Sequence, residues 1–365
     1  MRPISRNDHL HEPSLLDDED LKLVHALQLA PRAGWTSLAG ILGVHSTTLA
    51  ARWKRLTEAG IAWVAAHPVE TKLCPVTAFV EVQCAMTQRD AVIHELTSLA
   101  DVVSLDISAR HRDLLLTVVA TSIAQFTEAT LPMITGVPGV EHIETSFTTQ
   151  MHVIADAWTL RALTPDQRRR VANLHPRTTG AQAVPKVHLG VLRALSVDGR
   201  ASAADIARQL EMSEVTVRRQ IRAAMVTGLI NIRCELAQDV SGLPITAQWF
   251  ASAPASQHGA LAACMTGIPG VRMCASTTGR TNILIAVWLR SVTEVPLVER
   301  RLAEAVPGII LRESAIALRI VKRIGWMLGP GGRANGQVVP PSWGAAVADP
   351  GLDTHVDYSR QTVQR

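Results

Sequence analysis

The feature that most constrains this fold is an internal repeat. Several patterns of the first half return 168 positions later: Arg32-Ala33 as Arg200-Ala201, Leu42 as Leu210 and Gly60 as Gly228. Further on, Pro75-x-Thr77-Ala78 returns as Pro244-x-Thr246-Ala247, displaced by 169 because one residue is inserted after Gly228. A repeat of this length is as large as a whole domain, so the chain is predicted to be a tandem of two similar modules.

The first third of each module has the apolar spacing of helices. The stripes of the first module, in chain order, are Leu21-Leu23-Val24-Leu27, Leu38-Ala39-Leu42 and Leu49-Trp53-Leu56. Gly60 lies where the third helix would end in a left-handed C-cap. The pattern predicts a helix, a short helix, a tight turn and a third helix.

The remainder of each module alternates strand and helix patterns. In the first module the expected strands cover 75–84, 101–108, 113–120 and 140–154, and the expected helices cover 89–100 and 123–135. This β-α-β-β-α-β order is the ferredoxin-like plan. One face of such a sheet is left uncovered by its helices, and the second copy in the chain can provide its partner. The predicted fold class is α+β, with a helix-turn-helix domain and then a ferredoxin-like domain in each module.

These patterns also set the expected domain boundaries. In order they are a disordered leader (1–14), the first helix-turn-helix domain (15–62), the first sheet domain (63–158), a linker with a short helix (159–183), the second helix-turn-helix domain (184–231), the second sheet domain (232–328) and a disordered tail (329–365). Disorder is expected in the leader and the tail because they carry few apolar residues that could anchor them.

The composition argues against several classes of protein. No run approaches the roughly 18 apolar residues of a membrane helix, and the first residues lack the apolar core of a signal peptide. The five cysteines form no C-x-x-C pair, which favours a reduced, cytoplasmic chain. The histidines lack metal-ligand spacing, and no catalytic triad or phosphate-binding glycine loop is present. We therefore expect no membrane partner, metal, cofactor or catalytic residue, while a formal charge of +4 permits a polyanionic partner.

The third helix of the first module has an uncrowded, cationic outer face. If its apolar stripe faces the core, its small and basic residues face outward. Small residues allow close approach to a groove, and arginine can bond guanine or phosphate in a bidentate manner. Together with the preceding helix and turn, this face predicts a recognition helix for double-stranded DNA. The candidate DNA contacts of the first module are Arg32, Ser46, Thr47, Thr48, Ala51, Arg52, Lys54 and Arg55.

The corresponding helix of the second module is chemically different. Gln220 stands where Arg52 stands in the first module, and Ala223 stands where Arg55 does. Because glutamine suits adenine, we expect the two helices to prefer different half-sites. The candidate DNA contacts of the second module are Arg200, Ser213, Val215, Thr216, Arg218, Arg219, Gln220 and Arg222.

Three motifs of the first module, Leu16-Asp17-x-x-Asp20, Arg52-x-x-Arg55-Leu56 and Gly60-Ile61, precede the β-α-β-β-α-β pattern. In this order they resemble the Lrp/AsnC, or feast/famine, transcriptional regulators, and the resemblance covers nearly all of both modules. It implies a helix-turn-helix domain joined to a sheet domain that dimerises and binds an amino acid or related metabolite. Since usual members carry one unit per chain, this chain resembles a covalent dimer, and a homo-oligomer of such chains is expected. The second module departs from the pattern at Val184-Pro185, Gln220 and Ala223.

The resemblance also implies an effector site near the turn between the second and third strands of each sheet, where the family often has Gly-x-x-Asp. The second module has Gly279 with Asn282, and the first has Arg110 with Asp113, so neither has the full pair. Either each turn contributes half of a site, or sensing is altered or lost, or these are ordinary polar turns. The candidate effector contacts are Arg110, Asp113, Thr145, Ser146, Gly279, Asn282 and Ser314.

The sequence therefore predicts a sequence-specific DNA-binding transcriptional regulator that is not an enzyme. One alternative is a tetrapyrrole decarboxylase of the siroheme type, because some proteins of this architecture have that activity. Arg110-His111-Arg112 partly matches their histidine- and arginine-bearing strand region, whereas Leu114-Leu115-Leu116 replaces their aromatic run. The other alternative is an architectural protein that bridges DNA without an effector.

Overall fold

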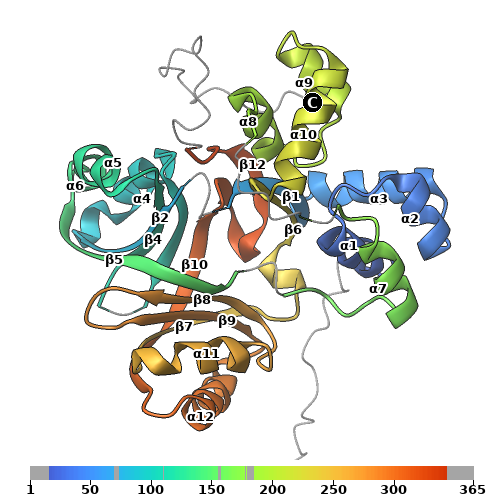
Figure 1. Ribbon diagram of the computed structural model, residues 1–365. Helices are drawn as coiled ribbons and strands as arrows, with labels where there is room; N and C mark the ends of the chain where they lie inside the picture. Colours follow the sequence, from blue (N-terminus) through green and yellow to red (C-terminus); the bar gives the residue numbers. More distant parts are fainter. Residues whose placement is uncertain are drawn as a thin grey trace, which may run out of the picture.

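The computed structural model describes residues 16–69, 74–109, 111–154, 158–176, 178 and 185–342 (Figure 1). Two helical heads lie at the top and right of the view, and a strand-rich body fills the left and bottom. The predicted α+β fold of two repeated modules is confirmed by this arrangement. The expected leader, part of the linker and the last part of the expected tail lie outside the described residues, as does Arg110.

The first head contains the three expected helices, α1 (Asp18–Leu29), α2 (Trp35–Leu42) and α3 (Ser46–Glu58). The carboxylate of Asp17 caps α1 by accepting a hydrogen bond from the amide of Asp20 at 2.8 Å. Gly60 has a φ of 64° directly after α3, as the sequence predicts. This left-handed conformation favours glycine, and the position has no room for a side chain because Ala334 lies against it.

The second head repeats the arrangement with α8 (Leu189–Val197), α9 (Ala203–Gln209) and α10 (Glu214–Val226). Ser202 and Ser213 cap the last two of these helices, each accepting a hydrogen bond from an amide three residues later. The turn between α9 and α10 is short, as it is between α2 and α3. Each head is therefore a helix-turn-helix unit in its local geometry.

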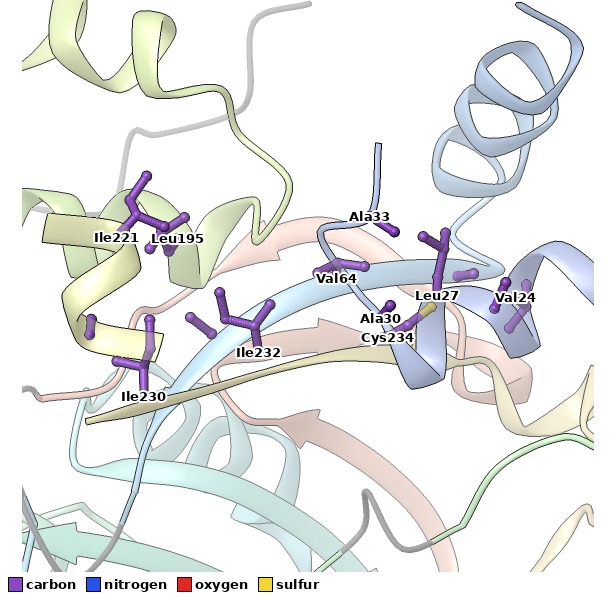
Figure 2. Close-up of a cluster of buried hydrophobic side chains, with 14 of the residues drawn as sticks. Val24, Leu27, Ala30, Ala33, Val64, Leu195, Ile221, Ile230, Ile232 and Cys234 are labelled. Atoms are coloured by element: carbon purple, nitrogen blue, oxygen red, sulfur yellow. The ribbon is translucent and has the colours of Figure 1, made fainter. Parts of the chain in front are cut away.

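A two-stranded antiparallel ribbon joins the heads. β1 (Ala62–Pro68) pairs with β6 (Ile230–Leu236), and Ala65 lies opposite Arg233 at the centre. Since the two strands occupy equivalent places in the repeat, the ribbon has local two-fold symmetry. Apolar side chains of both heads and of the ribbon meet in one shared core (Figure 2). The heads therefore form one packed unit rather than two independently tethered domains.

The body is a closed antiparallel barrel made from both sheet domains. The first module contributes β2 (Val76–Cys84), β3 (Val102–Ser108), β4 (Leu114–Ala120) and β5 (Val140–Val153). The second contributes β7 (Ile245–Ser252), β8 (Val271–Thr277), β9 (Ile283–Leu289) and β10 (Ile310–Arg323). The order is β10-β3-β4-β2-β5-β8-β9-β7, and β7 pairs again with β10. The two modules are thus joined by strand pairing at both edges: β5 pairs with β8, and β10 pairs with β3.

Helices cover the outside of the barrel. On the first module these are α4 (Arg89–Ser98) and the consecutive segments α5 (Ile123–Gln125), η2 (Phe126–Thr130) and α6 (Leu131–Thr135). On the second they are α11 (His258–Met265) and α12 (Val295–Ala305). The inner faces of the two sheets meet through Phe79, Leu115, Phe250, Ala275 and Leu284. Each sheet therefore buries the apolar face that its own helices leave uncovered, as expected from the sequence.

The segment expected to begin a disordered tail is ordered up to residue 342. After β10, the short strands β11 (Trp326–Leu328) and β12 (Ala334–Val338) form a hairpin against the heads. The amide of Ala334 donates to the carbonyl oxygen of Gly60 at 2.9 Å, and the indole of Trp326 donates to that of Ser196 at 3.0 Å. The expectation of disorder from residue 329 is wrong for this part because backbone pairing, rather than apolar anchors alone, fixes it.

The linker contains the expected short helix, α7 (Pro165–Ala172), which packs on the first head. Gln167 and Arg170 donate to the carbonyl oxygens of Ile41 and Gly40 at the end of α2. Single helical turns complete the description: η1 (Met86–Gln88), η4 (Gln238–Val240), η5 (Ala255–Gln257), η6 (Val292–Glu294) and η7 (Pro330–Gly332).

A buried ion cluster joins the ribbon to the barrel. The carboxylate of Glu235 on β6 is ion-paired with Arg233 and Arg272, the latter at 3.0 Å, and lies 3.6 Å from Arg323. Burial alone would raise the pKa of Glu235, but the three guanidinium groups lower it to about 2. Because this value lies below the ordinary 4.5, Glu235 stabilises the fold above pH 4.5 and loses that effect as the pH falls through about 2.

We predict that Glu235→Gln lowers the free energy of unfolding by about 3–5 kcal/mol, because it leaves buried guanidinium groups without a carboxylate. Urea unfolding of the full chain measures this cost. Glu214→Gln is the matched control, since Glu214 forms a surface pair with Arg218 and should cost no more than about 1 kcal/mol. Equal costs for the two variants would contradict the structural role of the cluster.

Candidate nucleic-acid interface and ligand cavities

The outer face of α3 carries most of the predicted DNA contacts of the first head. Thr47, Thr48, Ala51, Lys54 and Arg55 are exposed. Ser46 and Arg52 are only partly exposed. The small residues lie in the first two turns, so the helix presents an open surface there. This face fits the geometry of a helix that enters a major groove.

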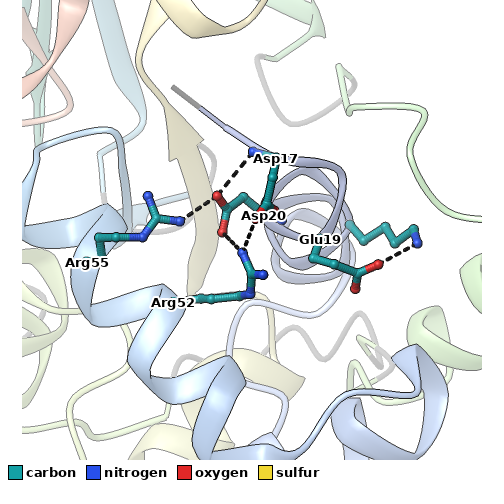
Figure 3. A network of polar contacts seen from close by, with 6 residues as sticks. Asp17, Glu19, Asp20, Arg52 and Arg55 are labelled. Carbon is teal, nitrogen blue, oxygen red and sulfur yellow. Dashed lines mark hydrogen bonds and ion pairs between the residues drawn. The ribbon is translucent and has the colours of Figure 1, made fainter. Parts of the chain in front are cut away.

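Arg52 and Arg55 are not free on this face. Arg52 is ion-paired with Asp17 at 2.6 Å and with Asp20 at 2.8 Å, while Arg55 contacts the other oxygen of Asp20 at 2.5 Å (Figure 3). The side chain of Asp20 is only 2% exposed, so its charge needs these partners. Arg55 faces outward as predicted, while Arg52 is turned toward Asp17 and Asp20. Both arginines tie α3 to the start of α1, and their contacts with DNA stay a prediction.

Gln220 is the equivalent of Arg52 in the second head, and it likewise ties the third helix to the start of the first. Its amide oxygen accepts a hydrogen bond of 2.8 Å from the amide of His188, directly before α8. His188 and Gln220 are the repeat equivalents of Asp20 and Arg52, so one neutral hydrogen bond replaces the ion pairs of the first head. The prediction that Gln220 selects adenine is therefore corrected, because the oxygen that would define such a contact is already engaged.

The outer face of α10 is the more cationic of the two. Arg218, Arg219 and Arg222 are all exposed, and of these Arg218 is paired with Glu214 one turn earlier. Val215 is 74% exposed at the start of the helix. Ser213 is engaged as the cap and Thr216 is half-buried beside it. Because more of its exposed basic residues are without an acidic partner on the described surface, the second head is the better candidate for phosphate contacts, even though its sequence departs from the family motif.

Arg32 and Arg200, both predicted DNA contacts, instead form a reciprocal clasp between the heads. Arg32 donates to the carbonyl oxygens of Gly199 and Ala201, and Arg200 donates to those of Pro31 and Ala33. Arg200 also stacks 3.9 Å from the ring centroid of Trp35. Burial lowers the pKa of both guanidinium groups, that of Arg200 to about 10. Their prediction as DNA contacts is corrected because the two-fold pairing of the heads turns them inward.

We predict that Arg32→Ala and Arg200→Ala each lower the free energy of unfolding by about 1.5–3 kcal/mol, because each loses charged hydrogen bonds to carbonyl oxygens. Chemical denaturation provides the measurement. Arg208→Ala on the exposed side of α9 is the control and should change stability by under about 0.5 kcal/mol. A clasp variant as stable as this control would restore a surface role for these arginines.

The two turns predicted to hold an effector line one cleft. This distal cleft, of about 1040 Å³, lies at the barrel end away from the ribbon, and both turns contribute to it through His111, Arg112, Arg280 and Thr281. Arg112 is 4% exposed, is ion-paired with Glu81 and Glu313, and stacks 3.7 Å from the ring centroid of Phe250. It therefore joins the two modules at the floor of the cleft.

Several of the predicted effector contacts already have hydrogen-bond partners within the protein. Asp113 accepts from the amide of Cys84 at 2.8 Å, and Asn282 exchanges hydrogen bonds with the backbone of Ala253. Ser146 lies against Gly279, so the structure brings these two together across the modules. Thr145 and Ser314 lie on β5 and β10, opposite Val80 and Trp249. Asp113 and Asn282 thus fasten their turns to the ends of the neighbouring strands β2 and β7, so their side chains are already engaged by the backbone.

A second cavity lies at the opposite end of the barrel, under the ribbon. This ribbon cavity has a volume of about 210 Å³ and is lined by His67 and Arg233 of the ribbon and by Asp106, Gln248 and Arg323 of the barrel. No local sequence pattern points to this cavity, because its residues come from many strands of both modules. The available signal was a charged or amide residue inside each apolar strand run, such as Asp106 in VVSLDIS or Arg272 in VRMCAST.

Two further observations concern only the described part of the chain. No group of three or more histidine, cysteine or carboxylate side chains there is arranged to hold a metal ion. No helix in that part is both long enough and apolar enough to cross a membrane.

Comparison with known proteins supports the reading of the heads. Residues 16–57 match the model of the AsnC-type helix-turn-helix domain, and residues 186–231 match that of a winged helix-turn-helix DNA-binding domain. The chain carries two DNA-binding-type helix-turn-helix domains. The predicted resemblance to Lrp/AsnC regulators, in a tandem form, is thereby confirmed for these segments. No curated protein sequence matches the chain.

Among solved structures, the siroheme decarboxylase NirDL, also in complex with an iron-uroporphyrin III analogue, matches 84% of this chain and 92% of its own, with 15% identity and a TM-score of 0.53. AsnC of E. coli matches 37% of this chain and 93% of its own, with 22% identity and a TM-score of 0.34. A regulator from Neisseria meningitidis in complex with L-Met matches 41% and 96%, with 23% identity and a TM-score of 0.34.

The match to NirDL corrects one expectation from the sequence. We expected a protein that is not an enzyme, yet a solved structure with this whole two-module fold is that of a decarboxylase. At 15% identity the likeness establishes the shared fold. The fold therefore gives no ground for excluding catalysis.

Proposed function

We propose that this protein is a sequence-specific DNA-binding transcriptional regulator in which one chain supplies both halves of a dimeric DNA-binding unit. The observation that carries the proposal is the pair of helix-turn-helix domains whose third helices, α3 and α10, keep exposed outer faces. The shared core, the ribbon and the clasp of Arg32 and Arg200 hold these two helices in one unit.

Each recognition helix would enter a major groove, with half-sites about 10–10.5 base pairs apart or a multiple of this. Lys54 in the first head and Arg218, Arg219 and Arg222 in the second would contact phosphates or bases. Because the exposed residues of the two heads differ, the half-sites are expected to be unequal and the operator non-palindromic. The difference between the half-sites would come from these exposed cations, and not from Gln220 or Arg52.

We further propose that an amino acid or related metabolite modulates this binding from the distal cleft. The support is that both predicted turns, and the pair Ser146 and Gly279, lie at that end of the barrel. A homo-oligomer of these pseudo-dimeric chains and a cytoplasmic location complete the proposal. None of the five cysteines, which all lie in the described part of the chain, forms a disulfide, and this fits a reducing compartment.

To test DNA binding, duplexes selected from a random pool are titrated with the full chain and with Arg218→Ala/Arg219→Ala/Arg222→Ala. We expect the triple variant to bind on the order of 100-fold more weakly, because each lost contact removes at least about 1 kcal/mol. Its dependence on salt should also be shallower, since fewer counterions are released. Fluorescence anisotropy at several salt concentrations measures both.

Arg300→Ala on α12 is the matched control, because it removes an exposed arginine from the far end of the barrel. It should bind like the unchanged protein. Failure to select any duplex at low salt, or an equal loss of affinity in this control, would argue against DNA recognition through α10.

A second candidate function, tetrapyrrole decarboxylation, is favoured by the match to NirDL and by the distal cleft. That cleft is large and has His111, His142, Arg280 and Arg312 around its mouth. These histidines and arginines could hold a polycarboxylate macrocycle by hydrogen bonds and ion pairs.

For this candidate, we expect iron-uroporphyrin III to bind the full chain with a shift of its absorbance bands, and His111→Ala to weaken that binding about tenfold or more by loss of a hydrogen bond to a charged group. Absorbance titration is the measurement, with His45→Ala on the first head as the control. An unchanged spectrum on titration would remove the candidate.

A further inference from the structure

Arg323 is a buried cation whose terminal nitrogens make no hydrogen bond. It is the last residue of β10, its side chain is 9% exposed, and it lines the ribbon cavity. Neither Nη1 nor Nη2 forms a hydrogen bond with a described residue, although Nη1 is ion-paired with Glu235 at 3.6 Å. Burying an arginine in this way is costly unless an acceptor is supplied.

The carboxylates around Arg323 are shared with other cations. Glu235 already serves Arg233 and Arg272, so one carboxylate faces three guanidinium groups. Lys322, the neighbouring residue, has its ammonium hydrogen-bonded to the carbonyl oxygens of Thr97 and Leu99 at the end of α4. His67 is neutral at ordinary pH, since burial lowers its pKa to about 3. The three guanidinium groups of Arg233, Arg272 and Arg323 therefore face two carboxylates, Glu235 and Asp106, and outnumber them by one.

The same cavity contains an unmatched acceptor. The side-chain oxygen of Gln248, a residue only 2% exposed, has no hydrogen-bond partner, while its amide nitrogen donates to Asp106 at 2.7 Å. Burial raises the pKa of Asp106 to about 6, although Arg323 and Gln248 both oppose the shift. An occupant of the cavity would therefore satisfy these groups best if it offered an anion to Arg323 and a donor to Gln248 or Asp106.

The rest of the wall limits the size and polarity of that occupant. Phe79, Leu115, Met151, Met273 and Trp288 supply apolar surface. The volume of about 210 Å³ lies below the usual 300–1,000 Å³ of ligand pockets, so a small metabolite fits and a macrocycle does not. A planar carboxylate matches the paired nitrogens of a guanidinium group, and an apolar body matches the aromatic and methionine side chains.

We propose that the ribbon cavity is a binding site for a small organic carboxylate that also carries a hydrogen-bond donor and an apolar body. Its carboxylate is held by Arg323, and its donor faces Gln248 and Asp106. This site lies at the other end of the barrel from the distal cleft and shares none of the residues expected to bind an effector.

Binding here would act on the heads directly, because Arg233 and His67 of the ribbon form part of the wall. The ribbon continues from α3 and α10, so a ligand that favours one ribbon position also favours one arrangement of the recognition helices. This consequence, unlike the binding itself, rests on the proposed DNA-binding function.

The test uses the full chain and a panel of small acids with matched skeletons: amino acids, the corresponding 2-hydroxy acids, the unsubstituted acids and the corresponding amines. We expect at least one amino or hydroxy acid to raise the melting temperature, and its amine to have no effect. Calorimetric titration then compares the protein with Arg323→Gln, for which we expect a Kd at least tenfold higher. Arg319→Gln, an exposed arginine on the same strand, is the control and should keep the original Kd.

The unliganded Arg323→Gln protein supplies an independent readout. Because Arg323 is the most distant of three guanidinium groups around one carboxylate, we expect its removal to lower the melting temperature less than Glu235→Gln does. Three results would each overturn the proposal: no acid of the panel raises the melting temperature, Arg323→Gln retains the original Kd, or unliganded Arg323→Gln melts as low as Glu235→Gln.

DNA binding by the same preparations separates the two proposals. An acid that binds through Arg323 to a protein without affinity for any selected duplex would refute the DNA-binding function and leave the cavity assignment standing. If the protein binds the selected DNA but none of the acids in the panel, only the cavity assignment is refuted. If both bindings occur, we expect the acid to change the DNA affinity, and the change to be absent in Arg323→Gln.

Discussion

Every part of this molecule depends on the burial of one sheet face against its repeat. A ferredoxin-like sheet covers one face with its own helices and leaves the other apolar. Here the apolar faces of the two sheets pack together through Phe79, Leu115, Phe250 and Leu284. Pairing of β5 with β8 and of β10 with β3 closes the barrel. Since both sheets belong to one chain, this pairing does not depend on protein concentration.

The closed barrel fixes what lies at its two ends. At one end the turns of both modules meet around Arg112, which neutralises carboxylates from both halves. At the other, Glu235 attaches the ribbon, and through it the heads, to β8 and β10. The ends differ in their hydrogen bonding: Arg112 bonds to the carboxylates of Glu81 and Glu313, whereas the terminal nitrogens of Arg323 form no hydrogen bond with any described residue. This difference is the reason for proposing the carboxylate site in the ribbon cavity and not at Arg112.

The two heads share one arrangement of helices but differ in the side chains that hold it. The contact between the recognition helix and the first helix is ionic in the first head, through Asp20 and Arg52, and neutral in the second, through His188 and Gln220. Both versions hold the third helix in the same place. The cationic residues that remain exposed are different in number and position, so two similar heads can present unequal surfaces to a duplex.

The sequence by itself determined the tandem architecture, the order of helices and strands and the positions of turns such as Gly60, because these follow from local periodicity and backbone preference. It also located the third helix of each head and the turns that line the distal cleft. Only the tertiary structure decided that Arg32 and Arg200 clasp opposite heads, that Arg52 pairs with Asp20, and that the terminal nitrogens of Arg323 are buried without a hydrogen bond to any described residue. The physical reason is that the role of a charged side chain depends on which opposite charges and carbonyl groups lie nearby in space, and most of these partners lie far away in the chain.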